Sequence, residues 1–552
     1  MLGLKDQTVH GGKSLADARA RHRWQIAPDY NVTADCLDRN QFQKDRVGLY
    51  YEDDEGHEER YTFGELLRLS NRAGNALRGL GIGRGDVVAV HAPQRPETAI
   101  VHMALYRIGA IGLPISKLFG PDAIQYRLSN SGAKAIVMEP ETVHKLEGIR
   151  GELPELRHVI VVGGRGDGLS FQELLEKASS DLKPEPSSPE DPILLMYTSG
   201  TTGNPKGVLH AGRYVLGHNG IDYSYNFLRD GDLYYSPADW AWAGGLLDGL
   251  LGIWPYGVPV LAYRSKARFD PDVTLRLMAK YRATVGLYPP TALKSLREVQ
   301  KPREKYPDLA LRCLVSGAEP VSPELGRWVA EVLRVEFNQG FGQTEANYFI
   351  GTCSALEPFK LEALGKPYPG HDVAVVDSEG RVLRNGETGE IAIRKNDPVV
   401  MKEYYKNPGA MKEKFAGEWC LTGDLGHADD EGYLYFQGRA DDVIKTSGYR
   451  VGPAEVEASI MEVPGVASCA VIGVADTQRG QAIKAFVKVL PGQEASNELV
   501  RRIQDHVKKK LAAHEYPREI EFMDEFPMTV TGKIRRRDLR EREEQRKRGS
   551  TS

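Results

Sequence analysis

Short apolar runs alternate along the first part of the chain with segments whose apolar residues recur at helical spacing. Residues 63–80 and 97–109 show the helical pattern, and the runs 87–90, 135–138 and 159–162 indicate buried strands. Strands that are apolar throughout and alternate with helices are typical of a parallel sheet covered by helices. The pattern therefore predicts an α/β fold built on parallel sheets.

The remaining segments before residue 438 predict less regular structure. Residues 1–60 are polar and mixed, and we interpret them as an N-terminal wrap rather than a domain. Residues 212–225 predict a helix. Residues 246–260 are apolar but broken by glycine and proline, so we expect a core helix packed against a sheet rather than a membrane span. Residues 373–393 predict two short strands with glycine-rich turns, and hence a β-rich subdomain.

A domain boundary is predicted near residues 438–442, where the pattern restarts as a small α+β unit. The elements predicted beyond it are a helix at 453–461, strands at 467–474 and 484–490, a helix at 498–511 and a strand at 519–523. We therefore expect an N-terminal domain over residues 1–439 and a small C-terminal lid domain over residues 440–552, with a hinge near Asp441. The charged end, residues 541–552, is expected to fray.

Length and charge restrict the class of protein. A chain of 552 residues exceeds one typical core, and a net charge of −4 excludes a strongly basic nucleic-acid binder. The five cysteines are scattered without a C-x-x-C pair, so we expect reduced thiols rather than disulfides or a zinc site. Without a membrane-length apolar run, or a secretory signal at residues 1–6, the expected location is the cytoplasm.

The segment with the most specific chemistry follows the apolar run at residues 193–195. Residues 198–207 contain three glycines, four hydroxyl side chains and one lysine. Glycine lets backbone N–H groups approach an anion closely, and such a nest with hydroxyl donors and a lysine suits a polyphosphate. The segment is not a G-x-x-x-x-G-K-[ST] loop, because Pro205 precedes Lys206 and a glycine follows. It predicts a site for a nucleoside triphosphate.

The string T-S-G-T-T-G-x-P-K-G at residues 198–207 resembles the signature of the adenylate-forming superfamily, which includes acyl-CoA synthetases, luciferases and peptide-synthetase adenylation domains. The resemblance covers residues 61–537 and is closest to acetyl-CoA synthetases and medium-chain acyl-CoA synthetases. It implies an AMP-forming acid–thiol ligase of fatty acid metabolism. Such an enzyme joins a carboxylate to ATP as acyl-AMP with loss of Mg-pyrophosphate, and then passes the acyl group to coenzyme A.

The resemblance also implies which residues bind ATP and Mg²⁺. The expected ATP contacts are Thr198, Ser199, Gly200, Thr201, Thr202, Gly203 and Lys206 for the phosphates, Gly317, Glu319 and Pro320 for the adenine, Gly342, Gln343 and Thr344 near the α-phosphate, and Asp424 and Arg439 for the ribose. Glu345 is the implied Mg²⁺ ligand. A strand-end loop with a hydroxyl and a carboxylate suits this role, because Mg²⁺ takes few carboxylates and shares phosphate oxygens. A carboxylate such as Asp424 can accept both ribose hydroxyls.

The C-terminal motifs imply a moving catalytic group. By the resemblance, Asp441 is the hinge, Gly448 passes close to the pantetheine of coenzyme A, Arg450 approaches a phosphate, and Lys533 is the mobile lysine of adenylation. A cation between the attacking carboxylate and the α-phosphate neutralises negative charge where it develops. The expected catalytic set is Lys533, Thr344, Glu345 and Lys206.

The sequence restricts the acyl substrate less than it restricts the nucleotide. Acetate-specific relatives carry a tryptophan at the position of Gly342, so glycine here predicts room for more than a methyl group. Each further buried methylene contributes ~0.8 kcal/mol, which favours short-to-medium acids, including branched or aromatic ones. Trp240, Trp242 and Tyr348 either line this pocket or belong to the core.

Four alternatives share part of this pattern. They are an acetyl-CoA synthetase proper, an adenylation enzyme that loads a separate carrier protein, a luciferase-type oxidative enzyme and a nucleotide-binding protein without catalysis. The expected partners are a small carboxylic acid, ATP and coenzyme A, with no nucleic acid and no membrane span. The sequence predicts no oligomeric state.

Overall fold

The computed structural model describes residues 2–164, 166–198, 204–266, 269–319, 321–440, 442–446, 449–476, 479–511, 515–528 and 534–549. The chain divides into two compact units. Unit 1 comprises residues 1–373 with 393–420, and unit 2 comprises residues 374–392 with 421–552. Each unit is described separately.

The first sheet of unit 1, sheet A, has nine strands in the order β16-β15-β14-β13-β12-β10-β11-β1-β2. Its strands are β1 (Val47–Asp53), β2 (Glu58–Thr62), β10 (Tyr234–Tyr235), β11 (Val260–Arg264), β12 (Val285–Leu287), β13 (Cys313–Gly317), β14 (Glu336–Gln343), β15 (Ala346–Gly351) and β16 (Lys366–Pro367). The strands from β14 to β1 run parallel, and antiparallel strands flank them. The expectation that residues 1–60 only wrap the protein is therefore wrong for 47–60. There β1 pairs in parallel with β11, and the mixture of apolar and acidic side chains in Val47–Asp53 hid the strand.

The second sheet of unit 1, sheet B, has eight strands in the order β19-β9-β8-β4-β3-β5-β6-β7. Its strands are β3 (Val87–His91), β4 (Ile111–Pro114), β5 (Ala135–Met138), β6 (His158–Val161), β7 (Leu169–Ser170), β8 (Pro192–Thr198), β9 (Lys206–Ala211) and β19 (Glu403–Tyr404). The strands from β8 to β7 are parallel, whereas β9 and β19 are antiparallel additions at one edge.

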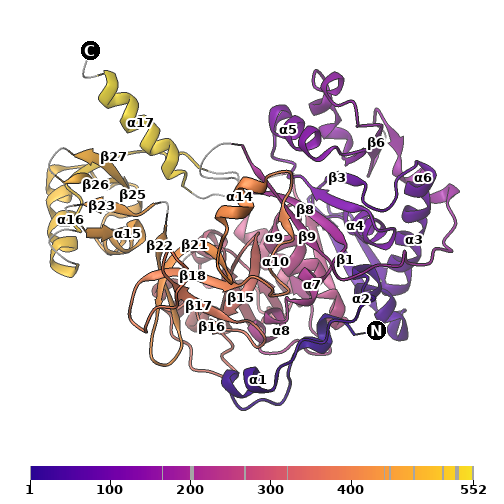
Figure 1. Ribbon diagram of the computed structural model, residues 1–552, viewed down its shortest axis with the longest axis horizontal. Helices are drawn as coiled ribbons and strands as arrows, with labels where there is room; N and C mark the ends of the chain where they lie inside the picture. The colour runs from indigo at the N-terminus through magenta and orange to yellow at the C-terminus, as the bar shows by residue number, and fades with distance from the viewer. Residues whose placement is uncertain are drawn as a thin grey trace. The chain divides into compact units, whose positions relative to one another are not determined.

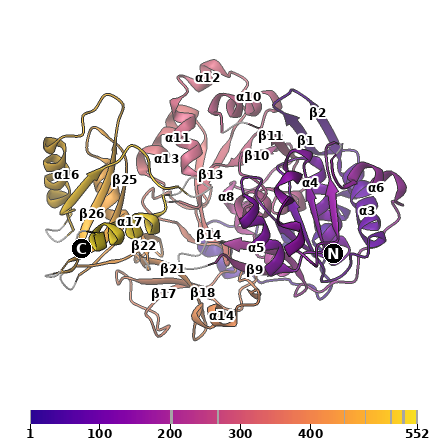
Figure 2. The same ribbon diagram turned by 90° about the horizontal axis from the view of Figure 1, so that it is seen from above.

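An apolar core lies between the two sheets of unit 1. The inward residues of β3 and β11, such as Val88 and Val260, belong to this core, and the alternate residues Ala89 and Leu261 face outward into two separate clusters. The principal helices are α3 (Phe63–Gly79) and α4 (Pro96–Arg107) in the central layer, α5 (Pro121–Ser131) outside sheet B, and α10 (Pro271–Tyr281), α11 (Pro290–Glu298) and α13 (Pro323–Trp328) outside sheet A (Figures 1 and 2). The predicted α/β class with parallel sheets is confirmed.

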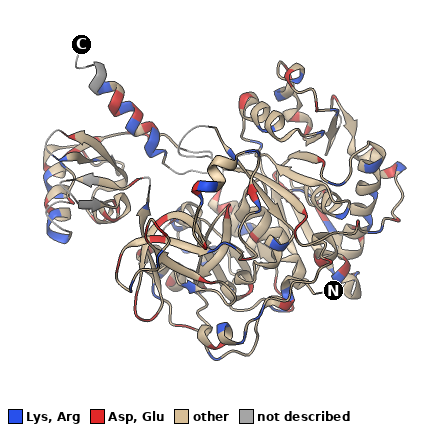
Figure 3. Cartoon of the chain, viewed as in Figure 1, with Lys and Arg blue, Asp and Glu red and all other residues tan. Residues whose placement is uncertain are grey.

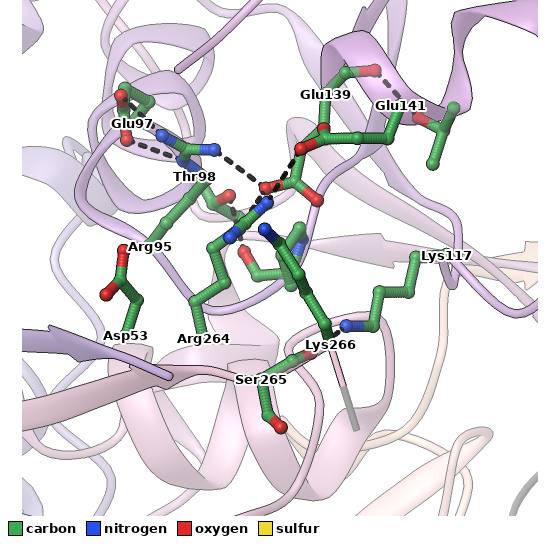
Figure 4. A network of polar contacts seen from close by, with 12 residues as sticks. Asp53, Arg95, Glu97, Thr98, Lys117, Glu139, Glu141, Arg264, Ser265 and Lys266 are labelled. Atoms are coloured by element: carbon green, nitrogen blue, oxygen red, sulfur yellow. Dashed lines mark hydrogen bonds and ion pairs between the residues drawn. The ribbon is translucent and has the colours of Figure 1, made fainter. Parts of the chain in front are cut away.

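A buried cluster of charges joins the ends of strands from the two sheets (Figure 4). Glu139 directly follows β5 of sheet B, and Arg264 ends β11 of sheet A. The Glu139 Oε1 atom lies 2.6 Å from Arg264 Nε and 2.7 Å from Nη1 of Arg95, which caps α4. Arg95 also binds Glu97 in a bidentate manner, at 2.7 and 3.0 Å. Carboxylate neighbours keep the pKa of the Arg95 guanidinium above its ordinary value despite burial. This charge clamp fixes the two sheets to each other.

Two predicted helices of unit 1 are broken. Residues 212–225 form two short helices, α7 (Arg213–Leu216) and α8 (Gly220–Ser224). Residues 246–260 form the π-helix η5 (Leu246–Leu251) and the 3₁₀-helix η6 (Trp254–Tyr256) before β11 begins. Close packing explains Gly252, because a Cβ there would lie 2.1 Å from Ile221 Cδ1 and 2.8 Å from the Leu247 carbonyl oxygen. Pro255 and the positive φ of Gly257 then end the helical stretch.

Unit 2 contains the predicted β-rich strands and the small α+β part. The first group comprises β17 (Val373–Val376), β18 (Gly389–Arg394), β21 (Trp419–Ala428) and β22 (Leu434–Arg439). The strand β20 (Phe415–Ala416), which pairs with the first two residues of β21, belongs to unit 1. The second sheet comprises β23 (Ile444–Thr446), β24 (Tyr449–Val451), β25 (Val466–Asp476), β26 (Gly480–Val489) and β27 (Glu519–Phe522), with the helices α15 (Pro453–Met461), α16 (Asn497–Lys510) and α17 (Arg536–Gly549). These elements match the predicted order.

The C-terminal end does not fray as expected up to residue 549. It belongs to α17, along which acidic and basic side chains intersperse (Figure 3). Arg537 and Glu541 pair at 2.6 Å with an i,i+4 spacing, and Arg542 pairs with Glu521 of β27 at 2.6 Å. Buried Leu539 anchors the helix against the sheet, so the charges support a packed helix. Among the described residues, no helix is long and apolar enough to cross a membrane.

Candidate active site

The predicted phosphate-binding segment connects the two strands of a hairpin. Thr198 ends β8 and pairs in register with Lys206, the first residue of β9. The Thr198 hydroxyl donates to the Lys206 carbonyl oxygen at 3.4 Å. The other predicted phosphate contacts of this loop lie outside the described residues: Ser199, Gly200, Thr201, Thr202 and Gly203. The structure thus brings the two ends of the loop together at the edge of sheet B.

Tyr404 connects Lys206 to Glu345, a residue of sheet A's β14–β15 turn. β19, which carries Tyr404, pairs with β9, so the aromatic ring lies beside the start of that strand. The Lys206 ammonium lies 5.2 Å from the centre of the Tyr404 ring, a cation–π distance. The Tyr404 hydroxyl donates a hydrogen bond to Glu345 Oε1 at 2.7 Å. Two of the four predicted catalytic residues therefore meet around a tyrosine that the sequence analysis did not select.

Thr344 and Glu345 occupy the short turn between β14 and β15. The Thr344 carbonyl oxygen accepts a hydrogen bond from Tyr214 Oη at 2.8 Å, and the Glu345 carbonyl oxygen accepts one from the Met401 N–H at 2.8 Å. Lys414 donates to the side chain of Gln343 at 3.1 Å. Among the described residues, the Thr344 hydroxyl makes no hydrogen bond. The turn is thus held through its backbone, which leaves this hydroxyl for a ligand.

The predicted adenine-binding segment lies beside this turn. Gly317 ends β13 and pairs in register with Gly340 of β14. A Cβ atom at Gly317 would lie 2.3 Å from the Gly340 carbonyl oxygen, so this close strand approach requires glycine. Ala318 has a φ of +68° and turns the chain towards half-buried Glu319. Pro320 lies outside the described residues.

The predicted ribose contacts pair with each other inside unit 2. Asp424 of β21 and Arg439 of β22 are partners in the antiparallel register, and Arg439 Nη1 lies 3.0 Å from Asp424 Oδ1. Gly423, with a φ of +78°, precedes Asp424, and its N–H donates to Glu390 Oε1 at 2.6 Å. The Arg439 side chain is 40% exposed. Adjacent strands therefore bring together two residues separated in sequence.

The predicted hinge and mobile-lysine residues are described only by their surroundings. Asp441, Gly448 and Lys533 lie outside the described residues, as does the side chain of Arg450, whose backbone belongs to β24. Asp442, next to the predicted hinge, pairs with Arg536 at 3.3 Å and with Arg540 at 2.8 Å, both on α17. Arg536 also pairs with Glu457 of α15 at 2.6 Å. These ion pairs join the start of the α+β part to the helix that follows Lys533.

The predicted acyl-pocket residues differ in burial. Trp240 and Tyr348 are 2% and 3% exposed and pack within the central core, whereas Trp242 is half-buried and meets Phe119 edge-on at 5.9 Å between ring centres. A Cβ at Gly342 would lie 2.3 Å from the Tyr348 backbone nitrogen. The backbone of this turn therefore requires glycine at 342. Of the three aromatic candidates, only Trp242 has partly accessible surface.

A buried polar cluster below the same turn was not predicted. Asp248 of η5 accepts a hydrogen bond at its Oδ1 from Asn347 Nδ2 at 2.6 Å, and the same amide nitrogen lies 3.2 Å from His218 Nε2. Burial raises the Asp248 pKa to about 8 and lowers the His218 pKa to about 4. A lone aspartate within an apolar run was the sequence signal for this cluster, because a buried carboxylate is costly without a partner.

A cavity of about 320 Å³ opens beside the β8–β9 hairpin. Its lining residues are Tyr126, Asn130, Asn204, Pro205, Lys206, Gly207, Tyr405, Lys406 and Asn407. Two lysines and three amides give it a polar surface suited to an anion. The described residues contain no group of three or more His, Cys, Asp or Glu side chains arranged for a metal ion. The single carboxylate of Glu345 fits a Mg²⁺ ion that shares phosphate oxygens, since that ion needs only one or two protein carboxylates.

Comparisons with known proteins agree on one family. The model for AMP-binding enzymes matches residues 37–405, and the model for the AMP-binding enzyme C-terminal domain matches residues 455–533. Acetyl-coenzyme A synthetase of Bacillus subtilis (strain 168) is 37% identical over 519 residues, which cover 92% of this chain and 90% of that protein. The mitochondrial acyl-coenzyme A synthetase ACSM4 of Homo sapiens is 35% identical over 563 residues, covering 98% and 95%. The crystal structure of the anthranilate CoA ligase AuaEII in complex with anthranoyl-AMP superposes with a TM-score of 0.85 at 31% identity, covering 94% and 98% of the two chains.

Proposed function

The chain belongs to the AMP-binding enzyme family and is an AMP-forming acid–CoA ligase, and from this premise we propose that it activates a short-to-medium chain carboxylic acid. The acid is joined to ATP as acyl-AMP and then transferred to coenzyme A. The observation that carries the proposal is the contact of Lys206 and Glu345 through Tyr404, because it joins the phosphate-loop hairpin to the turn with the α-phosphate and Mg²⁺ candidates.

In the first half-reaction, a carboxylate oxygen of the acid attacks the α-phosphorus of ATP. The bond from the α-phosphorus to the bridging oxygen breaks, and pyrophosphate leaves with the electron pair. We assign the β- and γ-phosphates to the 198–206 loop with Lys206, and the α-phosphate to the Thr344 hydroxyl. A Mg²⁺ ion held by Glu345 would supply further positive charge to the phosphate oxygens. The Tyr404 hydroxyl orients the Glu345 carboxylate for that task.

The nucleoside contacts follow from the positions of the remaining candidates. We assign the adenine to Gly317, Glu319 and Pro320, beside Gly342 and Gln343. We assign the ribose hydroxyls to Asp424, with Arg439 as its partner. The 3.0 Å ion pair supports this assignment, because it fixes the orientation of the Asp424 carboxylate.

In this proposal, the second half-reaction requires the small C-terminal lid domain to change its position. The small domain turns about Asp441, withdraws Lys533 and presents Gly448 and Arg450 to coenzyme A. The thiolate then attacks the acyl carbon, the bond to the AMP oxygen breaks, and AMP leaves. The ion pairs of Asp442 with Arg536 and Arg540 support a C-terminal lid domain that moves as one body with the segment that carries Lys533.

The proposal specifies the acyl group less precisely than it specifies the nucleotide or the thiol. Half-buried Trp242 supports an acid longer than acetate, whereas similarity to the Bacillus acetyl-coenzyme A synthetase favours acetate as the second candidate. A panel of acetate, butyrate, octanoate and benzoate tests both, with AMP release measured with and without coenzyme A. Preference for acetate would contradict the longer-acid proposal. Release stimulated by a holo-carrier protein instead of coenzyme A would contradict the choice of thiol.

The proposed location is the cytoplasm. All five cysteines are buried and free, which supports a reducing compartment. Fractionation of the source cells with an antibody to this chain tests that assignment, and recovery outside the cytosolic fraction would contradict it.

A further inference from the structure

Arg127 of α5 is a buried cation without a carboxylate partner among the described residues. It is 6% exposed, and its only hydrogen bond within that part of the chain runs from Nη1 to the Ala123 carbonyl oxygen at 2.8 Å. Burial lowers the pKa of the guanidinium to about 10, so the group stays protonated at pH 7. An unpaired buried charge has a high desolvation cost, which an anionic ligand at the remaining donors would offset.

The other buried cations of the described chain are all paired. Arg127 instead lies against two aromatic rings, with Cζ 4.1 Å from the ring centre of Phe119 and 5.7 Å from that of Tyr197. A cation–π contact uses the face of the guanidinium, so the N–H groups at its edge still need an acceptor. The paired cations, by contrast, each contact a carboxylate: Arg95 and Arg264 at Glu139, Arg107 at Asp38 and Lys484 at Glu543.

One turn of α5 contacts both ends of the predicted phosphate-binding loop. Tyr126 donates from its hydroxyl to the Pro205 carbonyl oxygen at 3.0 Å, near the end of the loop. Tyr197, the residue directly before the loop, donates from its hydroxyl to Asn130 Oδ1 at 2.6 Å. Arg127 lies between these two contacts on the helix and against the Tyr197 ring. Its position therefore belongs to the surroundings of the loop.

The side chain of Arg127 extends towards the edge of sheet B where that loop begins. Its hydrogen bond to Ala123, four residues earlier, shows that the guanidinium reaches back towards the N-terminus of α5. The helix follows β4, which pairs in parallel with β8, and a crossover helix runs antiparallel to such strands. Its N-terminus therefore lies at their carboxyl ends, the edge at which α/β sheets bind ligands.

We propose that Arg127 is a further phosphate-binding residue of the active site and contacts the outer phosphates of ATP, which leave as pyrophosphate. The inference rests on the proposed function and adds a residue to its nucleotide site. A guanidinium fork matches phosphate oxygens, and its fixed charge stabilises the negative charge that develops on the leaving group. Coenzyme A also carries phosphates, but the contacts of α5 with both ends of the phosphate loop favour ATP as the source.

Two variants of the purified full chain test the contact. Calorimetry with Mg-pyrophosphate measures binding directly, and steady-state kinetics measure the KM for ATP and for coenzyme A. Arg127→Met is expected to weaken pyrophosphate binding and to raise the KM for ATP, each by about twentyfold, with the KM for coenzyme A unchanged. Arg127→Lys keeps the charge without the fork and should stay within about fivefold of the unchanged chain. A raised KM for coenzyme A alone would overturn the assignment to ATP.

Thermal melts without ligand separate binding from a structural role. Arg127→Met should melt no lower than the unchanged chain, because it removes an unpaired buried charge. Arg107→Met is the matched control, since it removes a buried arginine that pairs with Asp38 at 2.6 Å. This control should melt lower and still bind pyrophosphate normally. A folded Arg127→Met that melts lower and binds pyrophosphate like the unchanged chain would overturn the inference.

Failure of the inference is distinguishable from failure of the proposed function. Normal pyrophosphate binding by Arg127→Met, in a protein whose unchanged chain catalyses acid-dependent exchange, would remove only Arg127 from the site. Absence of exchange with every acid, in an unchanged chain that binds Mg-pyrophosphate through Arg127, would contradict the proposed function and leave the phosphate contact in place. Absence of Mg-pyrophosphate binding by the unchanged chain would overturn the contact itself.

Discussion

The hydroxyl of Tyr404 donates a hydrogen bond to Glu345 at 2.7 Å, and the ring of the same tyrosine lies 5.2 Å from the Lys206 ammonium. One side chain therefore contacts both the phosphate-loop lysine and the proposed Mg²⁺ ligand. Its two contacts are chemically separate, because the ring faces the cation and the hydroxyl binds the carboxylate. Substitution by phenylalanine removes only the second.

Tyr404→Phe is expected to lower kcat/KM for ATP in pyrophosphate exchange by about tenfold and to raise the Mg²⁺ concentration needed for half-maximal rate. The reason is that a partner which orients a metal ligand typically changes metal affinity or activity by about 10–100-fold when removed. Titration of the rate with Mg²⁺ measures the effect. Tyr306→Phe is the control, since it removes a hydroxyl bonded to Asp272 at 2.8 Å. An unaltered Mg²⁺ dependence in Tyr404→Phe would show that the hydroxyl does not orient the metal ligand.

Gly423→Ala is expected to raise the KM for ATP about tenfold. A Cβ at this position would lie 2.9 Å from Arg439 Nη2, so the guanidinium must move away from Asp424, its partner in the proposed ribose site. The φ of +78° adds a backbone penalty of about 1 kcal/mol. Steady-state kinetics and a thermal scan measure the two effects.

Gly432→Ala is the control that separates the backbone penalty of Gly423→Ala from its displacement of Arg439. Gly432 has a φ of +83°, and a Cβ there would meet no atom within 4 Å. It should therefore lose a similar amount of stability while the KM for ATP stays unchanged. Similar KM values for the two variants would argue against Arg439 as a ribose-site residue.

The sequence predicted the parallel-sheet architecture because β3 and β5 are buried on both faces and therefore consist of continuous apolar residues. It predicted the candidate site where chemistry is local, as in the Thr344–Glu345 turn. It did not predict β1, whose mixture of apolar and acidic residues resembles a loop until β11 supplies the partner strand. Strand pairing over such a separation is a tertiary property.

Two buried contacts of the candidate site were missed for the same reason. Tyr404 lies 59 residues from Glu345 in sequence, and nothing in its own neighbourhood indicates a carboxylate partner. Asp248 was visible as an acid within an apolar run, but its hydrogen-bond partner Asn347 lies 99 residues away in sequence. Lys533 and Asp441 lie outside the described residues, so their roles remain predictions.

Glu139→Gln is expected to lower the free energy of unfolding of unit 1 by about 3 kcal/mol, because it leaves two buried guanidinium groups without their shared carboxylate. All six tryptophans lie in unit 1, so urea unfolding followed by tryptophan fluorescence reports on this unit. Glu141→Gln is the matched control. Its side chain is 57% exposed and pairs with Arg264 at 3.2 Å, so its loss should cost at most about 1 kcal/mol. Equal urea midpoints for the two variants would show that the clamp does not stabilise the sheets.

Asp248→Asn is expected to gain stability relative to the unchanged chain as the pH rises. Burial raises the folded-state pKa of Asp248 to about 8, whereas the ordinary value is 3.8. Between these values the unfolded chain loses the proton that the folded chain keeps, so this group lowers stability by about 1.4 kcal/mol per pH unit, and the loss is complete above about pH 8. The asparagine variant lacks this slope. Urea midpoints at pH 5, 6, 7 and 8 measure it.

Asp222→Asn is the control for the pH dependence of Asp248→Asn. Burial raises the Asp222 pKa to about 6, so the advantage of this variant should stop growing near pH 6 rather than near pH 8. Both variants replace a buried carboxyl by an amide, and only the pH window differs. Parallel pH profiles for Asp248→Asn and the unchanged chain would show that Asp248 does not retain its proton on folding.

Lys533→Ala is expected to abolish ATP–pyrophosphate exchange and to spare thiolysis of supplied acyl-AMP. A cation between the carboxylate and the α-phosphate matters only while negative charge builds up in adenylation, and attack of the thiolate on the acyl carbon does not use it. Arg535→Ala is the control, because it removes a cation two residues away that pairs with Asp538 at 3.0 Å and is 51% exposed. Loss of both half-reactions in Lys533→Ala would indicate a folding role, and retention of exchange would remove Lys533 from the mechanism. Selective loss of exchange, with Arg535→Ala active in both steps, is the result that a lysine acting only in adenylation requires.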